Sequence, residues 1–142
     1  MPGYDRVRWV DVSVSSSELL SLRATPKTCV NAPGTGKIAT FVEALLLLDA
    51  TATGYVESSA DLAFRYTNGS GAKVSDDIEA TGFIDQTADT MTTARAKQNV
   101  IVAKTGCENK PIVLHNIGAG EYTTGTGTLR LRVYYTVDST GW

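Results

Sequence analysis

The sequence predicts a mainly β protein: one antiparallel domain of the sandwich, jelly-roll-like or barrel type, with one or two short helical turns. The clearest evidence is the segment Leu129–Val137, in which apolar and polar residues alternate over nine positions, as they do in a half-buried strand. Turn-forming clusters of Gly, Asn, Ser and Thr separate several other short apolar runs, a spacing typical of sandwiches and barrels. The chain has the length of one domain, and we expect a single β domain over residues 1–142.

Residues 1–16 are predicted to form an N-terminal strand or arm, and a contact with neighbouring chains is one of the roles open to it. Three alternating valines give it one apolar side: Val10, Val12 and Val14. The segment SSELLSLR that follows is predicted to be one helical turn, capped by Ser16 or Ser17. A Ser in this position accepts a hydrogen bond from a free N–H group of the first turn.

The stretch NAPGTGKIAT, Asn31–Thr40, contains Gly-Thr-Gly-Lys, which also occurs in loops that bind phosphate. The phosphate-binding pattern G-x-x-x-x-G-K-S/T, however, places Asn31 at the first Gly and Ile38 at the hydroxyl that binds Mg²⁺. Pro33 also removes one N–H donor from the loop. We therefore predict a sharp turn between two strands here, and no nucleotide site.

The middle of the chain is predicted to hold four more strands, at 36–50, 61–66, 99–103 and 111–117. The first contains ATFVEALLLL, which has the propensity of a helix, but a strand is preferred because its neighbours read as strands. Its apolar run Ala44–Leu48 is expected to be a core segment. Asn68-Gly69 is the best hairpin dipeptide of the chain. The segment 85–97 is expected to be a polar loop, with a short helix as the alternative.

The predicted C-terminal strand has two different faces. One face is apolar and should meet the core: Leu129, Leu131, Val133, Tyr135 and Val137. The other face carries Arg130, Arg132, Tyr134 and Thr136. This second face is either solvated or an interface, and the sequence leaves both interpretations open.

Charge and hydropathy exclude several classes of protein. The net charge of −2 and the pI of about 5.3 argue against a general nucleic-acid binder, which would have a basic excess. The N-terminus MPGYDRVRWV lacks the apolar region of a signal peptide, and no apolar run approaches the length that spans a bilayer. We expect a soluble protein made in a cytoplasm, without a membrane or direct nucleic-acid partner.

The residues that could support catalysis or bind a metal are few. His115 is the single histidine, and a nucleophilic site could be built only around it, with Cys107 as the nearest thiol. His115 and the two cysteines, Cys29 and Cys107, give three zinc ligands where four are needed. The acidic pair Asp76-Asp77, with Asp61 or Glu79, could bind Ca²⁺ but reads better as a solvated loop. We predict no enzymatic activity, no catalytic residue, no metal and no cofactor.

Four blocks, in this order, resemble a family of small structural proteins of tailed bacteriophages. They are ELLSLRATPKTCVNAPGTGKI, DLAFRYTNGSGA, TGFIDQTADT and TGTGTLRLRVYYTV, at 18–38, 61–72, 81–90 and 124–137. The family is that of capsid decoration proteins, also called cement or head-stabilising proteins. The chain departs from the family pattern at Cys107 and its loop, and at Trp9 and Trp142.

The resemblance implies a non-enzymatic viral protein on the outer surface of the virion. Such proteins decorate the capsid as homotrimers and cement the expanded shell against the pressure of packaged DNA. The implied partners are the major capsid protein and other copies of the chain. Five residues are the candidate interface: Trp9, Arg130, Arg132, Tyr134 and Trp142. A phage tail-tip or fibre module that binds host glycans is the alternative function.

Overall fold

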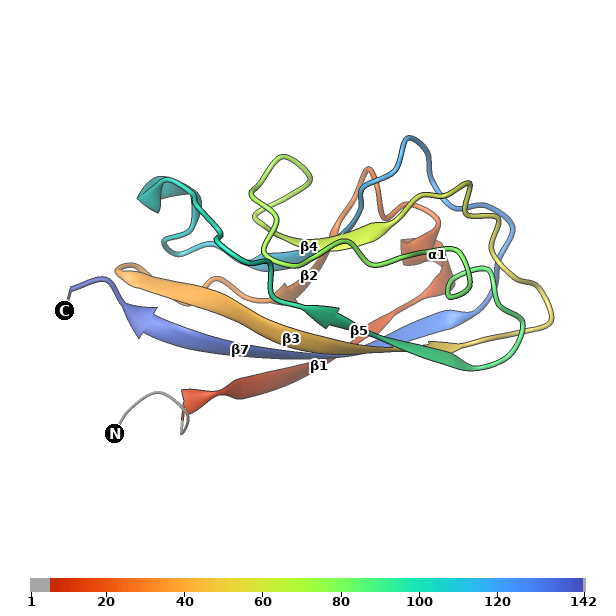
Figure 1. Cartoon of the computed structure of the whole chain (residues 1–142), viewed down its shortest axis with the longest axis horizontal. Helices are drawn as coiled ribbons and strands as arrows, with labels where there is room; N and C mark the ends of the chain where they lie inside the picture. Colours follow the sequence, from red (N-terminus) through yellow and green to blue (C-terminus); the bar gives the residue numbers. More distant parts are fainter. Residues whose placement is uncertain (1–5, 142) are drawn as a thin grey trace.

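The computed structural model describes residues 6–141, which form two antiparallel sheets packed face to face (Figure 1). The predicted mainly β sandwich is therefore confirmed. The strands are β1 Arg8–Val14, β2 Lys27–Val30, β3 Lys37–Asp49, β4 Leu62–Tyr66, β5 Thr90–Arg95, β6 Ile112–Asn116 and β7 Thr128–Ser139. The two short helices are α1 Ser16–Leu19 and η2 Lys104–Gly106.

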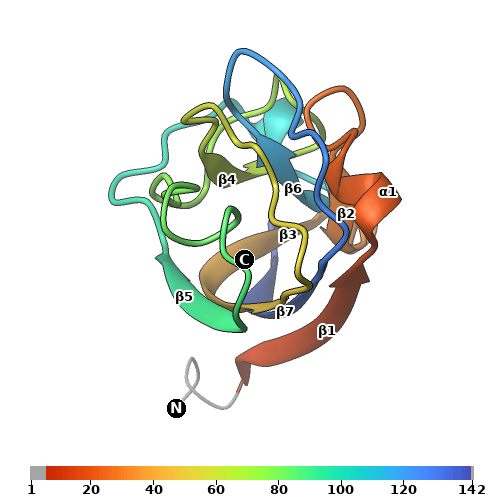
Figure 2. The same cartoon turned by 90° about the vertical axis from the view of Figure 1, so that its right-hand side faces the viewer.

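One sheet has four strands in the order β1-β7-β3-β5, and the other has three in the order β2-β6-β4. Figure 2 shows the two sheets as separate layers, with β4, β6 and β2 on one side of the core and the curved four-stranded sheet on the other. The rings of Phe41 from β3 and Phe64 from β4 stack across this core at 4.8 Å. Each fully buried side chain of this kind contributes about 1.5–3 kcal/mol through the apolar surface that it removes from water.

β3 is a strand over its whole length, as predicted, because it pairs with β7 on one edge and β5 on the other. The expectation that Ala44–Leu48 is a core segment is only half right. Leu46 and Leu48 are buried, whereas Leu45 is 39% exposed and Leu47 is half-buried on the other face of the sheet. The alternation of a strand divides even an all-leucine run between two faces.

Two predictions between residues 85 and 103 are wrong. The segment 85–97 is not only loop, since Thr90–Arg95 forms the edge strand β5. Only Ala94 of β5 is buried, so this strand lacks the apolar alternation that would reveal it. The segment 99–103 is not a strand in the structure. Asn99 has a φ of 58°, and this left-handed residue turns the chain out of an extended path.

Two smaller features of the fold also differ from the prediction. The four-residue strand β2 was predicted only as the strand before the Pro-Gly turn, without bounds, because four residues are too few to show a period. The first helix is capped by Ser15, and not by Ser16 or Ser17. The Ser15 hydroxyl accepts a hydrogen bond from the Glu18 N–H at 3.2 Å, and the Glu18 carboxylate accepts one from the Ser15 N–H at 3.0 Å. This reciprocal pair is a capping box.

Candidate functional site

The outer face of the four-stranded sheet is the candidate site. Its side chains point away from the core, and the three-stranded sheet lies on the opposite side (Figure 2). Cross-strand register places Trp9 beside Tyr134, and Asp11 beside Arg132. We call this surface the open face, and it consists of Trp9, Asp11, Ser13, Glu43, Leu45, Leu47, Asp49, Met91, Thr93, Arg95, Arg130, Arg132 and Tyr134.

Two arginines of the open face, Arg130 and Arg132, are each held by a carboxylate of a neighbouring strand. Arg132 donates through Nε and Nη2 to the two oxygens of Asp11, at 2.7 and 2.9 Å. Arg130 makes the same forked contact with Asp49, at 2.6 and 3.0 Å. These hydrogen bonds lower the pKa of Asp11 and Asp49. These four charges of the face are thus already paired within the chain.

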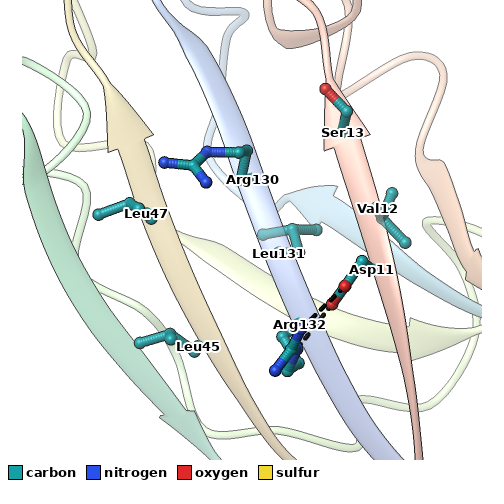
Figure 3. A pocket seen from close by; sticks show the side chains of 8 residues that line it. All are labelled: Asp11, Val12, Ser13, Leu45, Leu47, Arg130, Leu131 and Arg132. Atoms are coloured by element: carbon teal, nitrogen blue, oxygen red, sulfur yellow. Dashed lines mark hydrogen bonds and ion pairs between the residues drawn. The ribbon is translucent and has the colours of Figure 1, made fainter.

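Apolar side chains are exposed on the two edge strands of this face, β1 and β5. Trp9 is 59% exposed and Met91 is 56% exposed. The Trp9 and Tyr134 rings lie 6.4 Å apart, and the Arg132 guanidinium carbon lies 5.7 Å from the Trp9 ring centre, within cation–π range. A hollow of about 370 Å³ lies on this face. Figure 3 shows Leu45 and Leu47 on one side of it and the Asp11–Arg132 pair on the other.

The structure brings four of the five predicted interface residues onto this one face. These four are Trp9, Arg130, Arg132 and Tyr134, and their role in binding stays a prediction. Trp142 lies outside the described residues. The apolar members of the face were not predicted, since Leu45 and Leu47 were expected in the core and Met91 in a polar loop. The alternation along β3 is the signal that could have found the two leucines, because Glu43 and Asp49 share their side of the strand.

His115, the only candidate base, is fully engaged in the structure. Its Nδ1 accepts a hydrogen bond from Arg65 Nε at 3.2 Å, so the ring proton lies on Nε2, which donates to the Arg23 carbonyl at 3.1 Å. Burial is the largest cause that lowers the pKa of His115 below its usual 6.5, although the hydrogen bond to Arg23 raises it. With both nitrogens occupied, the ring connects β6 with the loops around it.

The two cysteines are free and buried. Burial raises the pKa of the Cys29 thiol to about 12, so this sulfur stays protonated at neutral pH and is a poor nucleophile. The Cys107 thiol lies 3.5 Å from the Lys104 carbonyl. Both side chains therefore act as small apolar groups of the core.

The Pro-Gly loop before β3 is a turn between two strands, as predicted. Its N–H groups already have partners from this chain: Gly36 N–H donates to a Glu108 carboxylate oxygen at 3.3 Å. Gly34 N–H donates to the Asn109 side chain at 2.9 Å. A carboxylate of the chain thus occupies the place where a phosphate-binding loop would hold its anion.

Two further observations concern residues 6–141 as a whole. Within them, no three His, Cys, Asp or Glu side chains are grouped closely enough to hold a metal ion. No helix in that part of the chain is long and apolar enough to cross a membrane.

No family model matches this chain, and no curated protein matches it. Among solved structures it is similar to a chain in the capsid of Ralstonia phage GP4, with 14% identity, a TM-score of 0.45, and coverage of 92% of this chain and 82% of that one. It is also similar to a chain in the VP2 subviral particle of infectious bursal disease virus, with 10% identity, a TM-score of 0.31, and coverage of 99% and 39%. Both similar structures are viral particles. Both TM-scores lie below 0.5.

Proposed function

We propose that this chain is a non-enzymatic structural protein of a tailed bacteriophage. It decorates the outer surface of the head as a trimer, binds the major capsid protein, and cements the expanded shell. The four ordered sequence blocks that resemble decoration proteins support the phage assignment. The observation that carries the proposal is the open face, an exposed and ordered surface suited to contact with another protein.

The composition of the open face fits a protein interface better than a merely solvated surface. Interfaces are enriched in aromatic residues, Met and Arg, and this face presents Trp9, Tyr134, Met91 and three arginines. Because Arg130 and Arg132 each already have a carboxylate, docking does not leave these two charges unpaired. The β-strands hold these side chains in place before binding, which reduces the entropy that binding costs.

The size of the face explains why several copies should act together. Four strands spaced about 4.8 Å apart and overlapping over about 24 Å present roughly 450 Å². A typical stable interface buries about 800 Å² on each partner, so one copy should bind weakly. A trimer on a three-fold position of the shell makes three such contacts, and the second and third are intramolecular once the first has formed.

Cementing requires selectivity for the expanded shell. A ligand stabilises one of two states only by binding it more tightly than the other. The decoration protein should therefore bind the expanded head and not the procapsid. Each bound trimer then adds its differential binding free energy to the stability of the expanded state, and no covalent bond is made or broken.

Co-sedimentation tests this proposal directly. Purified protein is mixed with expanded, undecorated heads of its phage, and with unexpanded procapsids as the control. Saturable binding to expanded heads alone, in multiples of three copies, is expected. Absence of binding to both shells would refute the decoration function.

A glycan-binding module is the second candidate, and the structure strengthens it in one respect. Trp9 and Tyr134 are far apart in the sequence, but their rings lie side by side on the open face. Apolar ring faces next to polar side chains suit the binding of a sugar ring. Quenching of the Trp9 fluorescence by host surface glycans, without binding to heads, would favour this alternative.

A further inference from the structure

β1 is an edge strand of the four-stranded sheet, and its outer edge is unpaired. In the order β1-β7-β3-β5 its one neighbour is β7. Within residues 6–141 no backbone hydrogen bond joins β1 to any other segment. Because antiparallel pairing directs alternate residues toward the neighbouring strand, about half of the seven residues Arg8–Val14 direct their N–H and C=O groups outward. Figure 2 shows this strand at the rim of the molecule.

The sheet edges on the opposite side of the sandwich are closed by the chain itself, through the segment 72–78. At the end of β5, the Asp76 N–H donates to the Arg95 carbonyl at 3.0 Å. Along β4, the Ile78 N–H donates to the Leu62 carbonyl at 2.7 Å, and the Leu62 N–H donates to the Ile78 carbonyl at 2.9 Å. The fold thus covers edges on one side of the molecule and leaves the edge of β1 uncovered on the other.

β1 lacks most of the features that protect an edge strand from pairing. Natural edge strands are shortened, bulged, or given Pro or Lys. β1 pairs with β7 over seven residues without a register shift, and its sequence RWVDVSV contains neither Pro nor Lys. The one charged side chain on its core side is Arg8, at the first position. A long, regular edge of this kind is a template for another strand.

The side chains of β1 define which strand could pair with it. Val10 and Val12 lie on the core side and are only half-buried, although they pack against the core. A strand with apolar side chains on that side would cover them. On the other side, Trp9 and Asp11 belong to the open face, so an added strand would continue this face. The edge therefore suits an extended segment with apolar residues at alternate positions.

The proposed trimer leaves this edge to the shell. Pairing of one β1 edge with another relates two copies by a two-fold axis, which gives a dimer and not a trimer. A head-to-tail ring would need a second free edge, and segment 72–78 leaves only a few residues of β5 unpaired. The open face offers roughly 450 Å², whereas a typical stable interface buries about 800 Å² on each partner. The shell contact thus needs further surface, and the edge of β1 adjoins the face.

We propose that β1 binds an extended segment of the major capsid protein by strand addition. Backbone hydrogen bonds to the outer edge of β1 provide affinity, and Val10 and Val12 select apolar residues at alternate positions. This inference rests on the proposed function and adds to it the chemistry of the partner: an extended chain with one apolar side. Docking on the open face alone would cover side chains without pairing the backbone of β1.

Hydrogen exchange of the protein, free and bound to expanded heads, tests strand addition directly. In the free protein the amides of β1 that point outward should exchange fast, and those bonded to β7 slowly. Binding should slow the fast amides of β1 at least tenfold. β5 is the matched control, because it is the other edge strand and carries Met91 and Thr93 on the same open face. Unchanged exchange in β1, or equal slowing in β1 and β5, overturns the proposal.

A substitution on the core side of β1 provides an independent test. Val10→Lys places a charge where the added strand would bring apolar side chains, and such an inward charge opposes pairing at an edge. The long side chain lets its ammonium group reach solvent, so the variant should fold, as judged by circular dichroism. It should bind expanded heads at least tenfold more weakly than the wild-type protein. Thr92→Lys is the control, because Thr92 is also half-buried on the core side of an edge strand, and it should bind normally.

Strand addition and shell binding can fail separately. A wild-type protein that does not bind expanded heads refutes both the proposed function and strand addition. Binding to heads that Val10→Lys leaves unchanged, or that Thr92→Lys weakens equally, refutes strand addition alone. Association of the free protein beyond the trimer that Val10→Lys abolishes would assign the edge to a second copy, and this result also overturns the proposal.

Discussion

The two sheets of the sandwich differ in what covers their outer sides. All five residues of β6, in the three-stranded sheet, are buried. In the four-stranded sheet, β7 alternates between buried and exposed positions from Leu129 to Val133. The outer side of β6 is covered by loops, since His115 contacts the Arg23 carbonyl, and a Cβ at Gly69 would lie 2.7 Å from the His115 ring. The covered sheet therefore contributes stability on both sides, and the open one leaves its outer side exposed.

The largest expected effect is on the free energy of unfolding, when the same Leu→Ala substitution is compared between the two sheets. Leu114→Ala in β6 removes a side chain that is 0% exposed, and should lower the free energy of unfolding by about 2–5 kcal/mol. Leu45→Ala on the open face should change it by less than about 1 kcal/mol. Denaturant unfolding of both variants measures the difference, and equal losses would contradict the distinction between the sheets.

Removing the hydrogen bonds of His115, on the covered side of the three-stranded sheet, should lower the free energy of unfolding by a smaller amount. His115→Ala leaves the partly buried Arg65 side chain and the Arg23 carbonyl without their partner. Such losses cost about 1–3 kcal/mol. The control is Ser13→Ala on the open face, which should be neutral within about 0.5 kcal/mol in the same unfolding experiment. A His115→Ala protein as stable as the control would show that the covering loops do not depend on this ring.

Acidification should lower the stability of the fold through His115 at a higher pH than that at which the carboxylates become protonated. The pKa of His115 is lowered in the folded state, so as the pH falls below about 6.5 the unfolded chain binds a proton that the folded chain does not. Stability is therefore fully present above this pH and decreases on acidification. Melting temperatures between pH 7 and pH 5 should fall for the wild-type protein and fall less for His115→Gln. Parallel curves for the two proteins would contradict this assignment.

The smallest expected effect on stability comes from a substitution on the open face. Arg132→Gln breaks an exposed ion pair with Asp11, and exposed pairs contribute little to stability. The melting temperature should stay unchanged, while binding to expanded heads should weaken because Trp9 loses the guanidinium packed over its ring. If the melting temperature falls and binding does not change, the pair serves the fold and not the contact.

Local pattern predicted much of this fold and part of the candidate site. The alternation in β7 correctly separated Arg130 and Arg132 from the core residues between them. This alternation could not predict that Trp9 lies beside Tyr134. β1 and β7 lie at opposite ends of the chain, and neither segment alone encodes the order of the strands in the sheet. β5 was not predicted, because an edge strand needs few buried residues and therefore shows no apolar alternation. The segment 99–103 has strand propensity without a partner, and propensity alone does not form a strand.

The most direct test of the central claim, that the open face binds the shell, is quantitative co-sedimentation of two matched variants with expanded heads. Leu45→Asp places a charge in the hollow of the open face, and Val56→Asp places the same charge at an apolar side chain that is 55% exposed outside that face. We predict that Leu45→Asp weakens binding more than about tenfold, or about 1.4 kcal/mol, and that Val56→Asp binds like the wild-type protein. Equal binding by the wild-type protein and Leu45→Asp would show that the shell is bound by another surface.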